Sequence, residues 1–367
     1  MKKLILSLLF LLLASQGAWA TYPSYTVCPS GCDYNTLNGA VADLEANHAT
    51  PASPVTITIS GTWSSPDTTS VNITGITTSA TNTVTITATG SARNNGTVQA
   101  GNYILGPASQ TSCMTLSGDN TYLIIDGLIF RYTPGTYDIG GTDAFVSEAI
   151  PQWIFKNNIF YLNPGGNFAY GNKNVIEIGG ATTGGTFKAY NNIFYNFANN
   201  SESSYECYGL NLTQYQGTYY VYNNTSYGND YGFNSSNTPT NSLFKNNISY
   251  NNTTADYTGT FSTASTNNLS GDSTAPAYNT YYANATVTFV NAGSNNFNLS
   301  ASDTGATGNG ANLSSDSYLP FTTDITGATR TVPWDIGAFK ATAIIISPHT
   351  ELFSNGNLYS KGNLYVQ

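Results

Sequence analysis

Tyrosine and lysine recur at equivalent positions of a repeated motif, and these two residue types together can bind sugars. A tyrosine ring stacks on the face of a sugar ring, and a lysine ammonium holds a carboxylate or a hydroxyl. We therefore predict a carbohydrate-binding strip that consists of Lys156, Lys188, Tyr190, Tyr220, Tyr222 and Lys245. The alternative is that tyrosine and lysine simply suit exposed strand positions.

Acidic residues near this strip supply the candidates for catalysis. Glu177 lies between Ile176 and Ile178, and this alternation predicts that its side chain points outward from a strand. A cation or an acid–lysine pair between Glu148, Glu177 and Lys188 would suit a polysaccharide lyase. The alternative is that both glutamates are isolated surface acids. We predict no metal site and no cofactor, and expect calcium only if the protein is a lyase.

A repeated strand-and-turn motif must position these side chains. Its anchor residues, separated by 21 to 34 positions, are Asp126, Asn157, Asn191, Asn223, Asn246 and Asn267. Such spacing, in which whole loops vary around a constant core, is typical of a solenoid. The residues just before the anchors, predicted to point outward, are Ile125, Lys156, Tyr190, Tyr222, Lys245 and Thr266.

The columns around the anchors have different expected roles. We expect the anchors themselves to form a hydrogen-bonded ladder along the solenoid. The next column begins at Gly127 and continues with Asn158, and these residue types favour a left-handed turn. The column after that is mostly Leu or Ile and is expected to point inward. Two positions later stands a candidate aromatic stack of Phe130, Tyr161, Tyr195, Tyr227 and Tyr250.

One helical pattern lies before the coils. Between Asn35 and Asn47, the apolar residues share one helix face, which suits a cap over the open strand edges of a solenoid end. The sequence therefore predicts an all-β chain, a single-stranded right-handed parallel β-helix with a short N-terminal capping helix.

Several segments carry a family resemblance. Cys28–Leu44, Tyr122–Leu128 and the Asn-Asn-Ile coils resemble the pectate-lyase-like superfamily of secreted right-handed parallel β-helix proteins. The C-terminal landmarks Asp324–Gly327, Arg330 and Asp335–Phe339 are similar to the closing segment of such proteins. The resemblance implies the fold, whereas the superfamily includes lyases, hydrolases, epimerases, adhesins and tailspikes.

The resemblance also allows the chain to be compared with the catalytic residues that enzymes of this superfamily use. Galacturonan hydrolases of this kind use an adjacent pair of aspartates, and no two aspartates are adjacent in this chain. Lyases use calcium-binding acids with an Arg or Lys base, and none of Arg93, Arg131 and Arg330 stands in the lyase motif. Whether the chain is catalytic is left open, and a lyase is favoured over a hydrolase if it is.

The ends of the chain suggest export. Residues 1–20 have the basic start, short apolar core and Ala18-Trp19-Ala20 site of a signal peptide. The expected divisions after it are a cap at 21–54, coils at 55–292, a closing segment at 293–342 and a tail of unknown role at 343–367. No other apolar run approaches the length of a membrane span. We expect a protein that is secreted, extracellular or at the cell surface.

The net charge argues against some classes of partner, and the cysteines suggest a compartment in which disulfides form. The formal net charge of −9, which becomes −11 once Lys2 and Lys3 are removed, argues against nucleic acid. An anionic polymer would need a local basic patch or calcium. Cys28 and Cys32 are predicted to form a local disulfide, because the alternative of a metal site lacks partners. Cys113 and Cys207 lie three coils apart, about 14 Å, and are predicted not to bond.

Three functional hypotheses remain. The first is a non-catalytic extracellular protein that binds polysaccharide or presents an adhesive or structural surface. The second is a polysaccharide lyase or glycoside hydrolase that acts on an extracellular glycan. The third is a structural element of a phage or a cell surface.

Overall fold

The computed structural model describes residues 24–107, 112–116, 122–133, 139–140, 152–163, 173–174, 176–178, 185–198, 206–212, 217–235, 242–276, 280–341, 353–354 and 357–358. The predicted signal peptide, Glu148 and most of the tail lie outside these residues, as does the side chain of Glu177.

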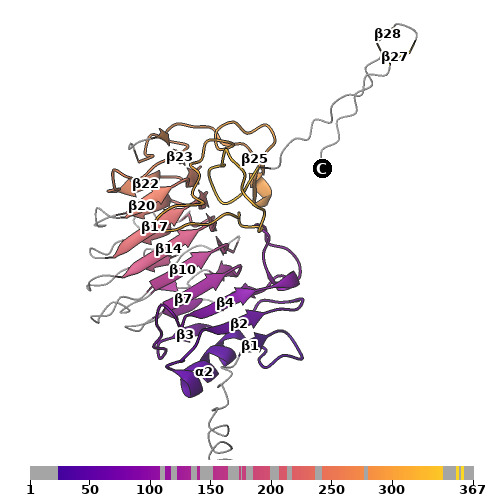
Figure 1. Cartoon of the computed structure of the whole chain (residues 1–367), viewed down its shortest axis with the longest axis vertical. Helices are drawn as coiled ribbons and strands as arrows, with labels where there is room; N and C mark the ends of the chain where they lie inside the picture. Colours follow the sequence, from indigo (N-terminus) through magenta and orange to yellow (C-terminus); the bar gives the residue numbers. More distant parts are fainter. Residues whose placement is uncertain are drawn as a thin grey trace, which may run out of the picture.

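The described strands form three long parallel sheets that run along the molecule (Figure 1). The first sheet contains β1 (Tyr25–Val27), β2 (Val55–Ile59), β4 (Val84–Ala88), β7 (Tyr122–Asp126), β10 (Gln152–Lys156), β14 (Thr186–Tyr190), β17 (Thr218–Tyr222) and β20 (Leu243–Lys245). The second contains β5 (Ile104–Leu105), β8 (Ile129–Tyr132), β11 (Ile159–Leu162), β15 (Ile193–Tyr195), β18 (Thr225–Tyr227), β21 (Ile248–Tyr250), β23 (Asn268–Ser270) and β24 (Tyr281–Tyr282). The third contains β9 (Ile139–Gly140), β13 (Ile176–Ile178), β16 (Cys207–Leu212), β19 (Tyr231–Ser235) and β22 (Ala255–Gly259), and β12 (Lys173–Asn174) pairs with β16.

The order of these strands confirms the predicted right-handed parallel β-helix. From β7 onward the chain passes from one sheet to another along each coil, and the strands of a sheet pair in parallel with the equivalent strands of the next coil. A smaller parallel pair joins β3 (Val71–Ile73) to β6 (Met114–Leu116). The antiparallel pairs are β25 (Phe289–Asn291) with β26 (Asn296–Leu299) and β27 (Phe353–Ser354) with β28 (Asn357–Leu358).

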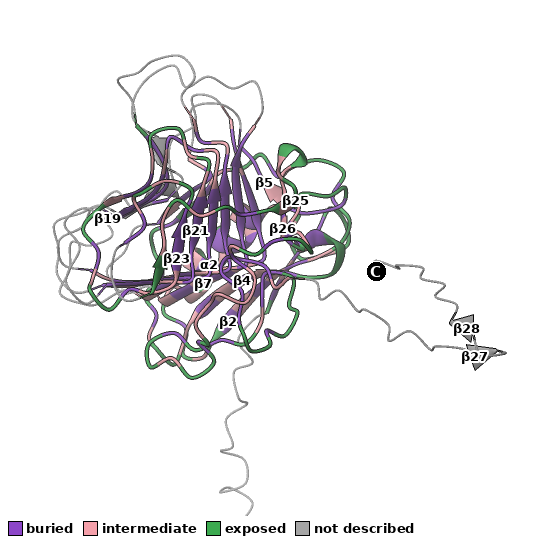
Figure 2. Cartoon of the chain, turned by 90° about the horizontal axis from the view of Figure 1, so that it is seen from above, coloured by how far each residue is buried: buried purple, intermediate pink, exposed green. Residues whose placement is uncertain are grey.

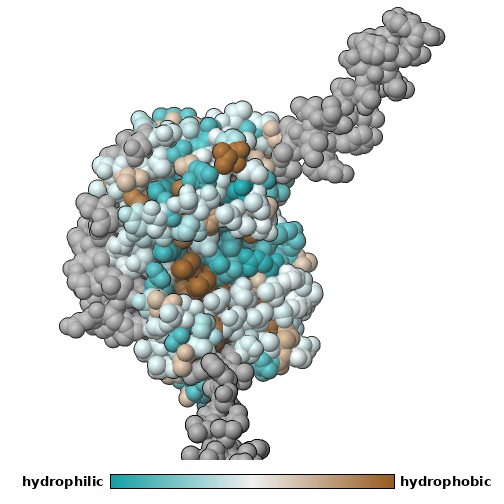
Figure 3. All heavy atoms as spheres, viewed as in Figure 1, coloured by the Kyte–Doolittle hydropathy of each residue, from teal (hydrophilic) through white to brown (hydrophobic). Residues whose placement is uncertain are grey.

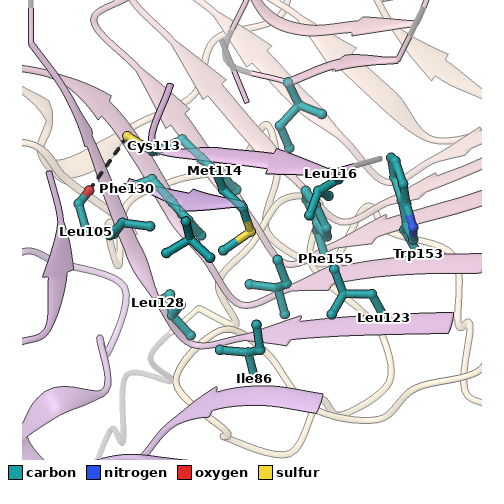
Figure 4. Packing of buried hydrophobic residues seen from close by; sticks show 14 of the residues in the cluster. Ile86, Leu105, Cys113, Met114, Leu116, Leu123, Leu128, Phe130, Trp153 and Phe155 are labelled. Atoms are coloured by element: carbon teal, nitrogen blue, oxygen red, sulfur yellow. Dashed lines mark hydrogen bonds between the residues drawn. The ribbon is translucent and has the colours of Figure 1, made fainter. Parts of the chain in front are cut away.

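The core lies inside the stack of coils, where Figure 2 shows the buried strands. Alternation places one face of each first-sheet strand inward, as in β2, whose Val55, Ile57 and Ile59 are buried. Aromatic rings stack along the interior: Phe130 on Phe160 at 4.8 Å and Phe160 on Phe194 at 5.1 Å. Figure 4 shows how such side chains fill the space between strands.

The predicted N-terminal helix is confirmed as α2 (Leu37–His48), which packs against β1 and β3 at one end of the stack (Figure 1). Thr36 caps it, because its Oγ1 accepts a hydrogen bond from the Gly39 N–H at 3.2 Å. The buried Asp67 carboxylate accepts another from the Leu37 N–H at 2.9 Å. The buried helix face consists of Leu37, Ala40, Val41 and Leu44.

The asparagine ladder is present, but its columns differ from the prediction. Gly127 is left-handed as predicted, whereas the left-handed asparagines lie one column earlier than predicted: Asn157, Asn191, Asn223, Asn246 and Asn267. The continuous buried ladder is made by the residues that follow them, Asn158, Asn192, Asn224, Asn247 and Asn268. The first predicted anchor was also wrong by one residue, since Asp126 pairs with Lys156. Ile125 therefore points inward, and Asp126 takes its place in the outward column.

The Leu and Ile column after the turn was predicted to point inward, which holds for Leu128 in the main core but is wrong for Ile159 and Ile193. Ile129, Ile159 and Ile193 form a cluster outside the coil interior, where Phe297, Ile325, Ala338 and Phe339 cover them. The inward positions belong to the phenylalanine column described above, so Phe130 does not belong with the tyrosines. Tyr161 and Tyr195 do stack, at 5.4 Å. The described part of the closing segment, residues 293–341, is thus an outer layer on the coils.

The cysteines lie where the coil register places them. Cys28 and Cys32 are joined in a disulfide, with Cα atoms 5.6 Å apart. Cys113 and Cys207 are buried thiols, and no disulfide joins them.

Candidate functional site

The structure brings all six residues of the predicted strip onto the outward face of the first sheet. Lys156, Tyr190, Tyr222 and Lys245 pair in register in one column. Lys188 and Tyr220 pair in the neighbouring column, which continues through Ile154 to Ile124. The strand alternation read from the sequence therefore placed these side chains together.

The strip is not an open groove, however, because the closing segment covers part of it. Tyr222 is 0% exposed and Tyr220 is 8% exposed. The Tyr190 ring lies 4.9 Å from that of Phe321. Leu313, Leu319, Phe321 and Trp334 complete this outer cluster. The prediction that Tyr222 offers an open ring face is corrected by this packing, since no part of the residue reaches solvent.

Asp316 fixes the closing segment to the sheet. Its carboxylate accepts a hydrogen bond from Lys245 Nζ at 2.6 Å and another from the Tyr222 hydroxyl at 3.3 Å. It also accepts from the backbone N–H groups of Tyr318 and Leu319. Although burial raises the pKa of this carboxyl, the hydrogen bond from Lys245 and those from the backbone outweigh it, and the pKa is lowered. Lys245 is therefore engaged within the protein.

Lys188 differs from Lys245 in having no such partner. Among the described residues, its ammonium has no hydrogen-bond or ion-pair partner, and Nζ lies 5.9 Å from the centroid of the Tyr220 ring. The residue is half-buried. Burial lowers the pKa of the Lys188 amine, and the charge of Asp316 only partly opposes this.

A charged cluster borders Lys188 on the same face. The Asp126 carboxylate lies 2.7 Å from Arg93 Nη2 and 3.5 Å from Lys156 Nζ, and it accepts a hydrogen bond from Asn157. Burial opposes its ionisation, but the hydrogen bond and charge of Arg93 and the charge of Lys156 lower its pKa overall. Two cations thus share one acid.

Cations are concentrated on this face. Arg93, Lys156, Lys188 and Lys245 are four of the eleven Lys and Arg residues in a chain with a net charge of −9. Asp316 forms an ion pair with Lys245, Arg93 and Lys156 share the carboxylate of Asp126, and Lys188 forms no ion pair with a described residue. Figure 3 shows the side of the molecule that carries β7, β10 and β14, where a hydrophobic area borders a broad hydrophilic one. These four cations outnumber the two carboxylates, Asp126 and Asp316, that pair on this face.

The catalytic candidates are not brought together by strand pairing. Glu177 belongs to β13 of the third sheet, whereas Lys188 belongs to β14 of the first. Glu148 lies outside the described residues, so an acid–lysine pair with it stays a prediction. Among the residues described, no group of three or more His, Cys, Asp or Glu side chains could hold a metal ion.

Sequence reasoning missed four members of this face: Arg93, Asp126, Asp316 and Tyr318. Asp126 was missed because the first coil was aligned one residue out of register. Aligning Gly127 with Asn157 and the other positive-φ asparagines would have placed Asp126 beside Lys156. Arg93, Asp316 and Tyr318 come from segments outside the repeat, so no column of the motif indicates them.

A hollow near the N-terminal end has a volume of about 250 Å³ and is lined by Trp63, Asp67, Thr36 and hydroxyl-bearing neighbours. The Asp67 carboxylate there already accepts bonds from Leu37, Thr69 and Tyr103. Asp67 therefore joins the helix to the first coils and is not available to a ligand in the hollow.

The fold defines the chain as a right-handed parallel β-helix protein with a covered outer face. Comparison with protein-family models gives no match, and comparison with curated proteins gives none either. Within the part of the chain that is described, no helix is both long and apolar enough to cross a membrane.

Proposed function

We propose that this chain is an extracellular β-helix protein that binds a polysaccharide carrying acidic groups on the outward face of the first sheet. Residues 1–20 support export, and the sequence resemblance to the secreted pectate-lyase-like superfamily supports an extracellular glycan as partner. The ligand would lie around Lys188, between the Arg93–Asp126–Lys156 cluster and the closing segment.

The half-buried ammonium of Lys188 carries the proposal. A cation that is withdrawn from water without an ion pair is costly, and a carboxylate or sulfate on a ligand would supply the missing partner. Lys245 provides the internal comparison, because the same residue type on the same face already has a carboxylate from Asp316. Arg93 and Lys156 add positive potential that would attract an acidic chain to this face.

A lyase is the second candidate, and the lowered pKa of Lys188 favours it. A lysine acts as a general base only as the neutral amine, and burial moves Lys188 toward that form. Glu148 and Glu177 remain the proposed acidic partners, and calcium is expected only in this case.

Retention of the purified mature chain on immobilised polygalacturonate, alginate and hyaluronan, with dextran as the neutral control, tests the proposal. We expect retention by at least one acidic polymer, weakening with salt, and none by dextran. Equal retention by all four, or by none, would contradict the proposal. Appearance of new reducing ends or unsaturated sugars, measured with and without calcium, would identify a lyase.

A further inference from the structure

The closing segment contributes an aromatic ring to the proposed binding face. Tyr318 stacks on Tyr220 with ring centroids 4.9 Å apart and planes inclined by only 16°. One face of each ring is therefore covered by the other. Tyr220 is nearly inaccessible, whereas Tyr318 is 51% exposed, so the outer ring surface at this position belongs to Tyr318.

Tyr318 is also held in place before any ligand arrives. Its backbone N–H donates to the Asp316 carboxylate at 2.9 Å, and Asp316 is bonded to Lys245 and Tyr222 on the sheet. Tyr318 is thus attached to the sheet in two ways, by its backbone through Asp316 and by its ring through the stack on Tyr220. A pre-positioned ring loses little conformational entropy when a ligand binds.

The Tyr318 ring and the Lys188 ammonium share a neighbour. Lys188 Nζ lies 5.9 Å from the centroid of the same Tyr220 ring on which Tyr318 stacks. Ring surfaces suit the apolar faces of sugar rings, and an ammonium suits an acidic substituent. The arrangement thus offers complementary contacts for the two parts of an acidic sugar unit.

We propose that Tyr318, rather than Tyr220 or Tyr222, is the ring that stacks on the bound polysaccharide, with Asp316 as its positioning residue. This inference rests on the proposed function, and it assigns part of the binding face to the closing segment. Lys188 selects for acidic groups, whereas Tyr318 contacts the sugar ring irrespective of charge.

The test measures affinity for polygalacturonate by titration calorimetry in wild type, Tyr318→Ala, Tyr318→Phe and Lys188→Met. The matched control is Tyr281→Ala, because Tyr281 on β24 is similarly exposed, at 44%, but belongs to the second sheet. We expect Tyr318→Ala to weaken binding about tenfold, roughly 1.4 kcal/mol. Tyr318→Phe and Tyr281→Ala should stay within about twofold of wild type.

The outcomes separate this inference from the function on which it rests. If Lys188→Met weakens binding but Tyr318→Ala does not, the assignment of Tyr318 is wrong and the proposed function stands. If wild type does not bind, alginate and hyaluronan replace polygalacturonate, and failure with all three overturns both. Thermal unfolding of each variant serves as a folding control, and Asp316→Asn should weaken binding in the same direction as Tyr318→Ala.

Discussion

Asn158 lies directly beneath Asn192, one coil apart, and its Nδ2 donates to the Asn192 Oδ1 at 3.1 Å. The same oxygen accepts the backbone N–H of Asn158 at 3.0 Å. Asn158 Nδ2 donates as well to the carbonyl of Ile125, which belongs to the preceding coil. Each buried amide thus links three coils. The ladder repeats this pattern up to Asn268, and it fixes the register of the stack.

Replacing a central ladder residue should therefore be costly. Asn224→Ala leaves the backbone and side-chain donors of Asn192 without their acceptor inside the core. We expect the free energy of unfolding to fall by about 3 kcal/mol or more, since each unsatisfied buried group costs about 1–3 kcal/mol. Urea unfolding measures this. The control is Asn312→Ala, at an exposed position, which should cost less than about 0.5 kcal/mol. Equal effects of the two substitutions would show that the ladder does not stabilise the coils.

Much of the fold could be predicted from sequence, because the solenoid repeats its local pattern in every coil. The Asn-Asn turns, the alternating strands and the helix over α2 each carry a short-range signal. The roles of the two asparagines could not be separated in this way, since either residue tolerates positive φ. In the structure, the backbone φ of +56° assigns the left-handed conformation to Asn157, and the hydrogen bonds assign the ladder to Asn158.

The closing segment explains why the site was predicted only in part. An isoleucine in a strand looks like core, and Ile159 is indeed buried. It is buried under Phe297 and Phe339, which lie more than a hundred residues away. The covering of Tyr222 has the same origin. Contacts between the repeat and a non-repeating segment leave no periodic signal.

Gly127 combines a positive φ, which only glycine adopts without strain, with a close approach to Arg93. Its φ is +79°, and a Cβ atom there would lie 2.2 Å from Arg93 Nη1. We expect Gly127→Ala to lower stability by about 1–3 kcal/mol from backbone strain alone, and further by displacing Arg93 from Asp126. Gly327→Ala is the matched control, because its φ is +90° and nothing lies within 4 Å of the added atom. Thermal unfolding should rank Gly127→Ala as the less stable, and the reverse order would argue against the Arg93 contact.

Arg330 holds the closing segment onto the coils. Its buried guanidinium donates to Asn191 Oδ1 at 3.0 Å and to the carbonyls of Gly337 and Ala338. Burial lowers the pKa of the Arg330 guanidinium, the charges of Asp324 and Asp335 partly oppose this, and the resulting pKa is about 10. Arg330→Met should reduce the free energy of unfolding by about 3–5 kcal/mol, because several buried carbonyls lose their donor. A loss below about 1 kcal/mol in urea unfolding would mean that the segment is held mainly by its apolar cluster.

The Asp316–Lys245 pair should make the attachment of this segment sensitive to acid. The pKa of Asp316 is lower in the folded protein than its ordinary value, so its stabilisation is complete above the ordinary value near 4. That stabilisation is lost as the pH falls through the lowered pKa. We expect Asp316→Asn to cost about 1–3 kcal/mol at pH 7 and progressively less as the pH falls through the lowered pKa. A cost that does not change with pH would contradict an ionised carboxylate at this position.

The lowered pKa of Lys188 predicts how binding depends on pH. Only the protonated amine attracts an acidic group, so affinity should fall as the pH rises through the lowered pKa, earlier than for an ordinary lysine. The guanidinium of Lys188→Arg keeps its charge to higher pH than the amine, so the loss of affinity should move to higher pH. Titrations at several pH values measure this difference. A common pH profile for wild type and Lys188→Arg would show that another group controls binding.

The most direct test of the binding face compares two lysine substitutions that remove the same charge. Affinity for the acidic polysaccharide that retains the wild type is measured for Lys188→Met and for Lys340→Met; Lys340 follows Phe339, which packs in the cluster over the isoleucines of the second sheet. We predict that Lys188→Met weakens binding about tenfold or more, whereas Lys340→Met stays within about twofold. Equal weakening by both substitutions would show that binding depends only on the overall charge of the protein. Full affinity in Lys188→Met would contradict a binding site on this face.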